Sequence, residues 1–319
     1  MKAIFFQTIY ELAKENPKLQ FIKADTAYIP DFQQAFPNQY LDVGIAEQNM
    51  IGVAAGMALE GKIPFTYSIV NFATMRCLEQ VRTQVAFNNL NVKIVSCGTG
   101  FDYGPLGATH HATEDLSIMR VIPNLTIFSP CDPIETVAVT KAAFAIDGPC
   151  FIRIGHGGEP NLHSSLIKNF QVGKVYTLKE GEDIKIFVTG SIAGEVMAAA
   201  VELGEKGHDV GVYSFPTIKP IDRDFIFECV HQAKIILSVE EHSIIGGFGG
   251  AVAEVIAEAS EKSAVFRRIG INDIFTDTIG DKEYLKSVYS LDKESIKEIV
   301  ESMNREIARN LQIPSTSNM

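Results

Sequence analysis

Short, mostly apolar runs alternate with helical stretches along the whole chain, and this alternation is the feature that most constrains the fold. Residues 92–97 and 150–154 are two such runs, each too short for a helix. Residues 46–59 and 133–145 have helical character, and Asp132 precedes the second stretch as a plausible cap with proline in the first turn. Strands that are apolar on both faces and alternate with helices indicate a parallel sheet covered on both sides.

The alternation is interrupted once, directly after Gly155. Residues 156–174 are rich in glycine and polar side chains, which is typical of a linker. A second series of strands and helices begins with IKIFVTG. We therefore predict an α/β protein of two doubly wound domains, residues 1–165 and 170–319, each a mostly parallel sheet with helices on both faces. Disorder is expected after Leu311.

Composition and charge exclude several classes of protein. The net charge of −11 argues against binding nucleic acid through its phosphates. The five cysteines are scattered and never spaced CxxC, which predicts free thiols in a reducing compartment and no metal site on this chain. No signal peptide is recognisable, and no apolar run approaches the ~18 residues of a membrane span. We expect a cytoplasmic protein with neither nucleic acid nor membrane as its partner.

Glu47 is the residue with the strongest chemical signal. It begins a helix of small and apolar residues in the stretch YLDVGIAEQNMIGVAAGM. An acidic residue in a first helical turn complements the helix dipole, and most such residues are solvent-exposed. This helix, however, is too apolar for a surface position. A half-buried Glu47 is expected, with a pKa raised by desolvation, and such a carboxylate is a candidate for handling protons.

This stretch resembles the pyrimidine-binding domain shared by transketolase, 1-deoxyxylulose-5-phosphate synthase and the beta subunits of 2-oxoacid dehydrogenases. The resemblance continues through FATMRCLEQVR, GATHHATEDLSIMR and GPCFIRIG. In the second domain, VEEHSIIGGFGGAVAEVIAE is similar to the transketolase C-terminal domain. Since it covers nearly the whole chain, the resemblance identifies the C-terminal subunit of a split transketolase as the nearest type.

The resemblance implies roles for individual residues around thiamine diphosphate. Glu47 would bond a ring nitrogen of the aminopyrimidine, and this starts the activation of the thiazolium carbon. Phe72 would stack on the pyrimidine, although a phenylalanine at a helix start is usually a core residue. His110, in a glycine-rich loop after a strand, would lie near the bound sugar and take part in catalysis. Asp25 would lie close to the thiazolium.

The resemblance also implies a partner. A complete transketolase has a preceding domain that holds the diphosphate through a metal bound by a GDG-type motif, and the GD pair here, Gly280-Asp281, is followed by Lys282. We therefore expect a separate N-terminal subunit that holds Mg²⁺ and the diphosphate. The cofactor would lie between chains in a dimer of heterodimers, and this chain alone would be inactive.

Substrate recognition departs from the family pattern at several positions. Leu106 stands where an acidic residue contacts a substrate hydroxyl, and leaving that hydroxyl unpaired costs about 1–3 kcal/mol. His156 stands in place of an arginine that holds the substrate phosphate, and histidine cannot form the same bidentate contact. Arg153 could substitute, or it could be a buried ion-pair partner. His111 replaces a glutamine. We hypothesise a modified or nucleotide-linked sugar or sugar phosphate.

These observations predict the transfer of a two-carbon ketol unit between sugar-type substrates. The alternatives are the beta subunit of a 2-oxoacid or acetoin dehydrogenase, a condensation like that of 1-deoxyxylulose-5-phosphate synthase, or a nucleotide-binding regulatory or scaffold protein. The glycine-rich turn at residues 246–250 lacks the GxGxxG spacing, so close helix packing is expected there. His242 could lie at a subunit interface, cap a helix or belong to the core.

Overall fold

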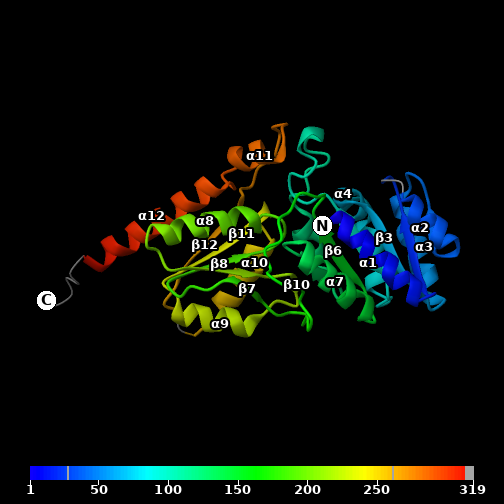
Figure 1. Cartoon of the computed structure of the whole chain (residues 1–319), viewed down its shortest axis with the longest axis horizontal. Helices are drawn as coiled ribbons and strands as arrows, with labels where there is room; N and C mark the ends of the chain where they lie inside the picture. The colour runs from blue at the N-terminus through cyan, green and yellow to red at the C-terminus, as the bar shows by residue number, and fades with distance from the viewer. Residues whose placement is uncertain (27–28, 261, 313–319) are drawn as a thin grey trace.

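Two mostly parallel sheets flanked by helices lie side by side in the computed structural model, which describes residues 1–26, 29–260 and 262–312 (Figure 1). The predicted α/β fold class is confirmed. In the first sheet the strand order is β10-β5-β6-β4-β3-β1-β2, and all pairs are parallel except β10 with β5. The strands of this sheet are β1 (Leu19–Lys23), β2 (Tyr40–Asp42), β3 (Ile63–Ile69), β4 (Lys93–Cys97), β5 (Thr126–Phe128), β6 (Cys150–Ile154) and β10 (Thr217–Lys219).

Helices cover both faces of the first sheet. α1 (Lys2–Glu15) and α7 (Pro133–Ala145) pack together on one face, where Phe5, Phe21 and Tyr67 belong to one core cluster. α3 (Glu47–Leu59) packs on the other face. The remaining short elements are α2 (Pro30–Ala35), η1 (Pro37–Gln39), α4 (Val70–Ala73), η2 (Met75–Cys77), α5 (Leu78–Gln80), η3 (Val81–Ala86), η4 (Gly104–Leu106) and α6 (Asp115–Arg120).

The second sheet has the strand order β12-β11-β8-β9-β7, with β7 antiparallel to β9 at one edge. Its strands are β7 (Tyr176–Lys179), β8 (Ile184–Val188), β9 (Val210–Ser214), β11 (Ile235–Ser243) and β12 (Val265–Ile271). α8 and α12 pack together, as do α9 and α10, so helices again lie on both faces. The helices are α8 (Ala193–Glu205), α9 (Arg223–Gln232), α10 (Phe248–Ala257), α11 (Lys282–Val288) and α12 (Lys293–Gln312).

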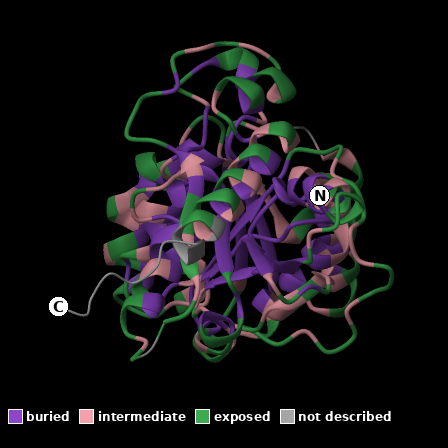
Figure 2. Ribbon diagram, turned by 90° about the vertical axis from the view of Figure 1, so that its left-hand side faces the viewer, coloured by how far each residue is buried: buried purple, intermediate pink, exposed green. Residues whose placement is uncertain are grey.

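Burial follows this layering, since the strands of both sheets are mostly buried and the outer helix faces are exposed (Figure 2). Between β6 and β7 the described residues form no helix or strand, as expected for the linker. The two halves are nevertheless joined, because β10 comes from the second half of the chain and extends the first sheet. The boundary between 165 and 170 is therefore crossed by a strand pairing that no local pattern indicates.

Most of residues 70–86 are helical, but they do not form one regular α-helix. The segment is divided into α4, η2, α5 and the π-helix η3. The interruption falls at Thr74, which has φ −111° and ψ −82° and whose hydroxyl donates to the carbonyl of Val70 at 2.6 Å. A side chain that bonds back to the preceding turn competes with helix continuation, and π-turns concentrate at functional sites.

Two further expectations concern the C-terminal residues and membrane-spanning helices. α12 continues to Gln312, and residues 313–319, for which disorder was predicted, lie outside the described residues. None of the helices in the described ranges is both long and apolar enough to cross a membrane.

Candidate active site

The predicted site residues follow neighbouring strands at one edge of the first sheet. Asp25 follows β1, Glu47 follows β2, Phe72 follows β3, His110 lies in the loop after β4, and His156 follows β6. Because these strands are parallel neighbours, their carboxyl ends meet at the same edge, where ligands bind in open α/β sheets. This shared edge is what brings residues from distant parts of the sequence together.

Glu47 is buried more deeply than the sequence predicted. Its side chain is 1% exposed, because α3 packs against the segment that contains Arg76. Oε2 accepts a hydrogen bond from Arg76 Nη1 at 2.9 Å, whereas Oε1 is buried and has no partner among the described residues. A buried acceptor without a donor is destabilising, so Oε1 is available to a ligand that brings an N–H group.

Phe72 and Arg76 stand between Glu47 and the loop after β4. The Arg76 guanidinium carbon lies 4.1 Å from the centroid of the Phe72 ring, and the His110 ring meets Phe72 edge-on at 5.3 Å. The neighbouring Asn71 amide donates to the carbonyls of Thr109 and His111, and so fixes this loop beside α4. An open depression of about 520 Å³ is lined by Asn71, Phe72, Met75, Arg76, Ala108, Thr109, Thr113, Glu114, Ile118, Phe275 and Thr276.

A row of rings continues from His110 away from Glu47. The Tyr103 ring lies 6.2 Å from His110 and 5.1 Å from His156. Beyond it, Lys2 Nζ lies 3.5 Å from His156 Nε2. Desolvation and the Lys2 ammonium lower the pKa of His156. The far end of the row therefore carries two basic groups, and Lys2 is a residue that the sequence alone did not identify.

Asp25 lies at the same edge but forms none of the contacts that join Glu47, Phe72 and His110 within the described part of the chain. It is exposed and has a positive φ of 40°, and its backbone N–H donates to the carbonyl of Gly44 at 3.1 Å. Its role near the thiazolium stays a prediction.

Arg153 is a buried ion-pair partner, one of the two alternatives left open above. Its Nε lies 2.7 Å from Asp115 Oδ2, and its Nη2 donates to the carbonyls of Ala112 and Glu241. The side chain is 1% exposed, and these contacts all lie inside the protein. A substrate-binding role for Arg153 stays a prediction that this burial does not favour.

The two residues that depart from the family pattern in the loop after β4 differ in exposure. His111 is buried, and its two ring nitrogens contact Thr276 Oγ1 at 2.7 Å and the carbonyl of Gly104 at 3.1 Å. It therefore links the loop to the segment before α11. Leu106, in η4, is 55% exposed and presents an apolar side chain at the surface.

Lys282 holds the loop after β4 against the second half of the chain. Its ammonium bonds Asp102 Oδ1 and the hydroxyl of Ser191, and Glu241 Oε2 lies 3.9 Å away. Burial lowers the pKa of Lys282, but Glu241 and Asp102 outweigh this effect and raise it. Asp102 also accepts the backbone N–H of His156 at 2.9 Å. Lys282, which stands where a GDG motif would have its second glycine, thus belongs to a charged cluster that positions His156 through Asp102.

The glycine-rich turn before α10 is filled by a side chain of its own chain. Glu240 accepts the backbone N–H groups of Phe248 and Gly249 at 2.6 and 2.7 Å, where a phosphate would otherwise bind. Burial raises the pKa of Glu240 to about 7, although these backbone bonds lower it. A Cβ on Gly247 would lie 2.2 Å from Glu240 Oε2, so close packing requires glycine there, as expected.

His242 caps a helix, which was one of the three roles considered for it. Its Nε2 accepts the backbone N–H of Leu116 at 3.1 Å, and its Nδ1 lies 2.7 Å from the carbonyl of Ser243. These contacts define a neutral imidazole that donates from Nδ1. Desolvation lowers the pKa of this fully buried ring, in agreement with the neutral form.

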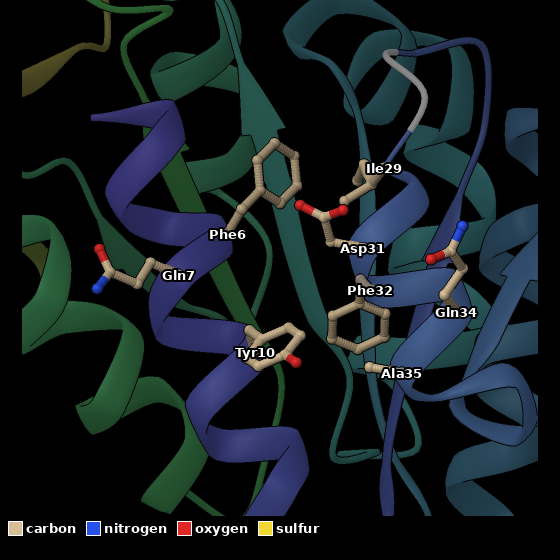
Figure 3. A pocket seen from close by; sticks show the side chains of 8 residues that line it. All are labelled: Phe6, Gln7, Tyr10, Ile29, Asp31, Phe32, Gln34 and Ala35. Atoms are coloured by element: carbon tan, nitrogen blue, oxygen red, sulfur yellow. The ribbon is translucent and has the colours of Figure 1, made fainter.

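Two further features lie away from the Glu47 site. A larger depression of about 700 Å³ lies between α1 and α2, where Phe6 and Tyr10 face Phe32 (Figure 3). It shares no lining residue with the depression beside Phe72. Within the described ranges, Cys131, Glu135 and His163 are grouped closely enough to hold a metal. Both Glu135 oxygens are already bonded, to the Cys131 N–H and to His163 Nε2, so the group is explained as an internal link.

The fold and the site together define an α/β enzyme subunit of the transketolase type. Residues 1–157 match the family model described as "Transketolase, pyrimidine binding domain", and residues 173–296 match "Transketolase, C-terminal domain". The chain therefore belongs to the transketolase family. The predicted resemblance is confirmed, as is the prediction of a transketolase-type transferase subunit.

Similar proteins include subunits of two-chain enzymes. An apulose-4-phosphate transketolase subunit of Actinobacillus succinogenes is 38% identical over 88% of this chain and 89% of its own length. A 6-deoxy-6-sulfo-D-fructose transketolase subunit of Clostridium sp. (strain MSTE9) is 36% identical over 94% of this chain and 92% of its own length. A solved structure described as a split gene transketolase, inactive beta4 tetramer, has a TM-score of 0.85 and 36% identity, covering 94% of this chain and 96% of that one.

The family implies thiamine diphosphate as the cofactor, and the residues at the site fit its aminopyrimidine. Glu47 Oε1 is a buried acceptor that has no donor among the described residues, and the ring of Phe72 borders a depression that Arg76 also lines. A flat heterocycle with N–H groups would satisfy the first and stack on the second. A carboxylate and an aromatic ring placed in this way are therefore compatible with the cofactor.

Proposed function

We propose that this chain is the pyrimidine-binding subunit of a cytoplasmic two-chain transketolase that transfers a two-carbon ketol unit between sugar-type substrates. A separate N-terminal subunit would hold Mg²⁺ and the diphosphate, in a dimer of heterodimers with the cofactor between chains. The observation that carries this proposal is the buried Glu47 Oε1, which has no partner in the part of the chain that the structure describes, at the start of α3 in a transketolase-type fold. The relatives do not favour a dehydrogenase beta subunit, a synthase-like condensation or a scaffold.

Each site residue has a separate part in this mechanism. Bound thiamine diphosphate supplies the nucleophilic carbon and stabilises negative charge on the transferred unit. Glu47 Oε1 would share a proton with the pyrimidine ring, and its burial would strengthen that hydrogen bond because water could not compete. Phe72 would orient the ring, and His110, in edge contact with Phe72, would exchange a proton with a substrate hydroxyl.

The substrate is proposed to be a sugar with an anionic end. Lys2 and His156 are 3.5 Å apart, and no carboxylate lies within ion-pair distance of Lys2 among the described residues. The Lys2 ammonium without a carboxylate partner favours an anion beside it, and the neighbouring His156 could add a hydrogen bond. The relatives' names include one phosphorylated and one sulfonated sugar, and both carry such an end. The exposed Leu106 provides no hydrogen bond for a hydroxyl, which favours a sugar modified at the position facing it.

Glu47→Gln in the reconstituted two-chain complex tests the proposed function. Glutamine keeps the shape of the side chain but cannot share its proton with the ring, so turnover is expected to fall by at least about 100-fold, within the range of general acid–base effects. Glu60→Gln, the same change at an exposed glutamate that ends α3, is the matched control and is expected to retain activity. Full activity of Glu47→Gln would end this proposal.

A further inference from the structure

Arg76 contacts the same two side chains that the proposed function assigns to the pyrimidine ring, Phe72 and Glu47, although it bonds Glu47 through Oε2 and the ring is assigned to Oε1. Its guanidinium lies over the ring of Phe72 at 4.1 Å and donates to Glu47 Oε2 at 2.9 Å. A group that stacks on Phe72 and bonds Glu47 at once occupies the space between these two side chains. From this coincidence we infer that Arg76 is a latch, which fills the pyrimidine position in the free subunit and leaves it when the cofactor binds. The inference rests on the proposed function.

The chemistry of arginine suits this substitution. The guanidinium is planar, permanently charged and able to stack on an aromatic face while its N–H groups bond a carboxylate. A pyrimidine that shares a proton with Glu47 is likewise planar, stacks on an aromatic face and presents N–H groups to the carboxylate, although it is not permanently charged. Lysine has neither the planar shape nor the paired donors, so only an arginine can occupy the pyrimidine position in this way.

The position of Arg76 allows the side chain to move without the backbone. Its carbonyl accepts a hydrogen bond from Gln48 Nε2 at 3.1 Å, which ties η2 to α3. The side chain is 43% exposed, and in the described part of the chain its guanidinium has no hydrogen bond or ion pair besides the one with Glu47. Rotation about its side-chain bonds therefore moves it into the open depression that it helps to line.

Arg76 stabilises the free subunit by compensating the charge of Glu47. Glu47 is almost completely buried, and a buried carboxylate without a compensating charge is strongly destabilising. Arg76 supplies that charge while no cofactor is present. The same position opposes the cofactor, because the guanidinium must leave the Phe72 ring, and with it Glu47 Oε2, before a pyrimidine can stack there. Removing Arg76 should therefore weaken the free subunit and ease cofactor entry, two effects of opposite sign.

Arg76→Met separates a latch from a residue that simply binds the cofactor. The free chain should unfold at lower urea concentration than wild type. In the two-chain complex, stopped-flow measurements with thiamine diphosphate and Mg²⁺ should show association about 2- to 30-fold faster, which is the fold-change that corresponds to a cation–π contact. Arg82→Met is the matched control, because Arg82 is exposed in the same segment and has no contact with Glu47; it should change neither quantity.

Each outcome decides the inference. Slower or weaker cofactor binding by Arg76→Met would overturn it, because Arg76 would then stay in place and help to hold the cofactor. Unchanged binding and unchanged stability would overturn it as well. If Arg76→Met does not fold, Arg76→Lys keeps the charge beside Glu47 without the planar stack, and faster association is again expected. Failure of the wild-type complex to bind thiamine diphosphate would instead contradict the proposed function.

Discussion

Arg153 and Asp115 form an ion pair that solvent does not reach. Arg153 Nε lies 2.7 Å from Asp115 Oδ2, and the two side chains are 1% and 0% exposed. The guanidinium also donates to the carbonyls of Ala112, in the loop after β4, and of Glu241, in β11. One side chain thus connects β6 to α6, to the active-site loop and to the second sheet, so its effect on the site is indirect.

Arg153→Met is expected to lower the free energy of unfolding by about 3–5 kcal/mol, because it leaves the Asp115 carboxylate buried without its partner. Urea unfolding followed by circular dichroism measures this change. Arg267→Met is the control, since Arg267 is 44% exposed in a loose ion pair and an exposed pair contributes about 0–1 kcal/mol. A stable Arg153→Met protein with a raised substrate KM would instead support a substrate-binding role.

Gly247→Ala is expected to destabilise the protein by about 1–3 kcal/mol through overpacking. An added Cβ would lie 2.2 Å from Glu240 Oε2 and 2.8 Å from the carbonyl of Ser243, and the backbone there cannot give way easily. Gly204→Ala provides the comparison, because Gly204 is exposed near the end of α8 and nothing lies within 4 Å of its Cβ position. Thermal unfolding should show a lower midpoint for the first variant and an unchanged or higher one for the second.

The pH dependence of stability should include a contribution from His163. Burial alone lowers the pKa of His163, but the hydrogen bond and charge of Glu135, with Asp132, outweigh it, so the pKa is raised above its usual value near 6.5. The stabilisation is therefore complete below about pH 6.5 and is lost as pH rises through the higher folded-state pKa. His163→Gln should reduce the loss of stability between about pH 6 and pH 8, measured as urea midpoints. An identical loss in both proteins would contradict this assignment.

Lys2→Met is expected to raise KM for an anionic sugar substrate by about tenfold, which corresponds to one charge-assisted hydrogen bond. The value of kcat should change little, because Lys2 lies at the far end of the ring row from Glu47. Lys14→Met, on the same helix α1 but in an exposed pair with Glu11, is the control. Steady-state kinetics of the two-chain complex separate these parameters, and equal KM values for the two variants would speak against an anion site at Lys2.

Local patterns were sufficient for several features of this protein. The helix that begins with Glu47 and the helix capped by Asp132 were predicted because helix starts depend on residues within one turn; Asp132 accepts the Glu135 N–H at 2.7 Å. The alternation of strands and helices determined the α/β class for a similar reason. The motif around Glu47 indicated the family and the position of the carboxylate.

Other features depended on contacts between distant segments. Lys2 and His156 are separated by 154 positions, and Arg76 reaches Glu47 only because α3 packs against η2. No local sequence pattern indicates either contact, since each depends on the order of strands in the sheet. The sequence alone thus determined the fold class, and it indicated Glu47 as the residue proposed to handle the proton. The tertiary structure decided what surrounds that residue, because burial and long-range pairing arise only when the sheet assembles.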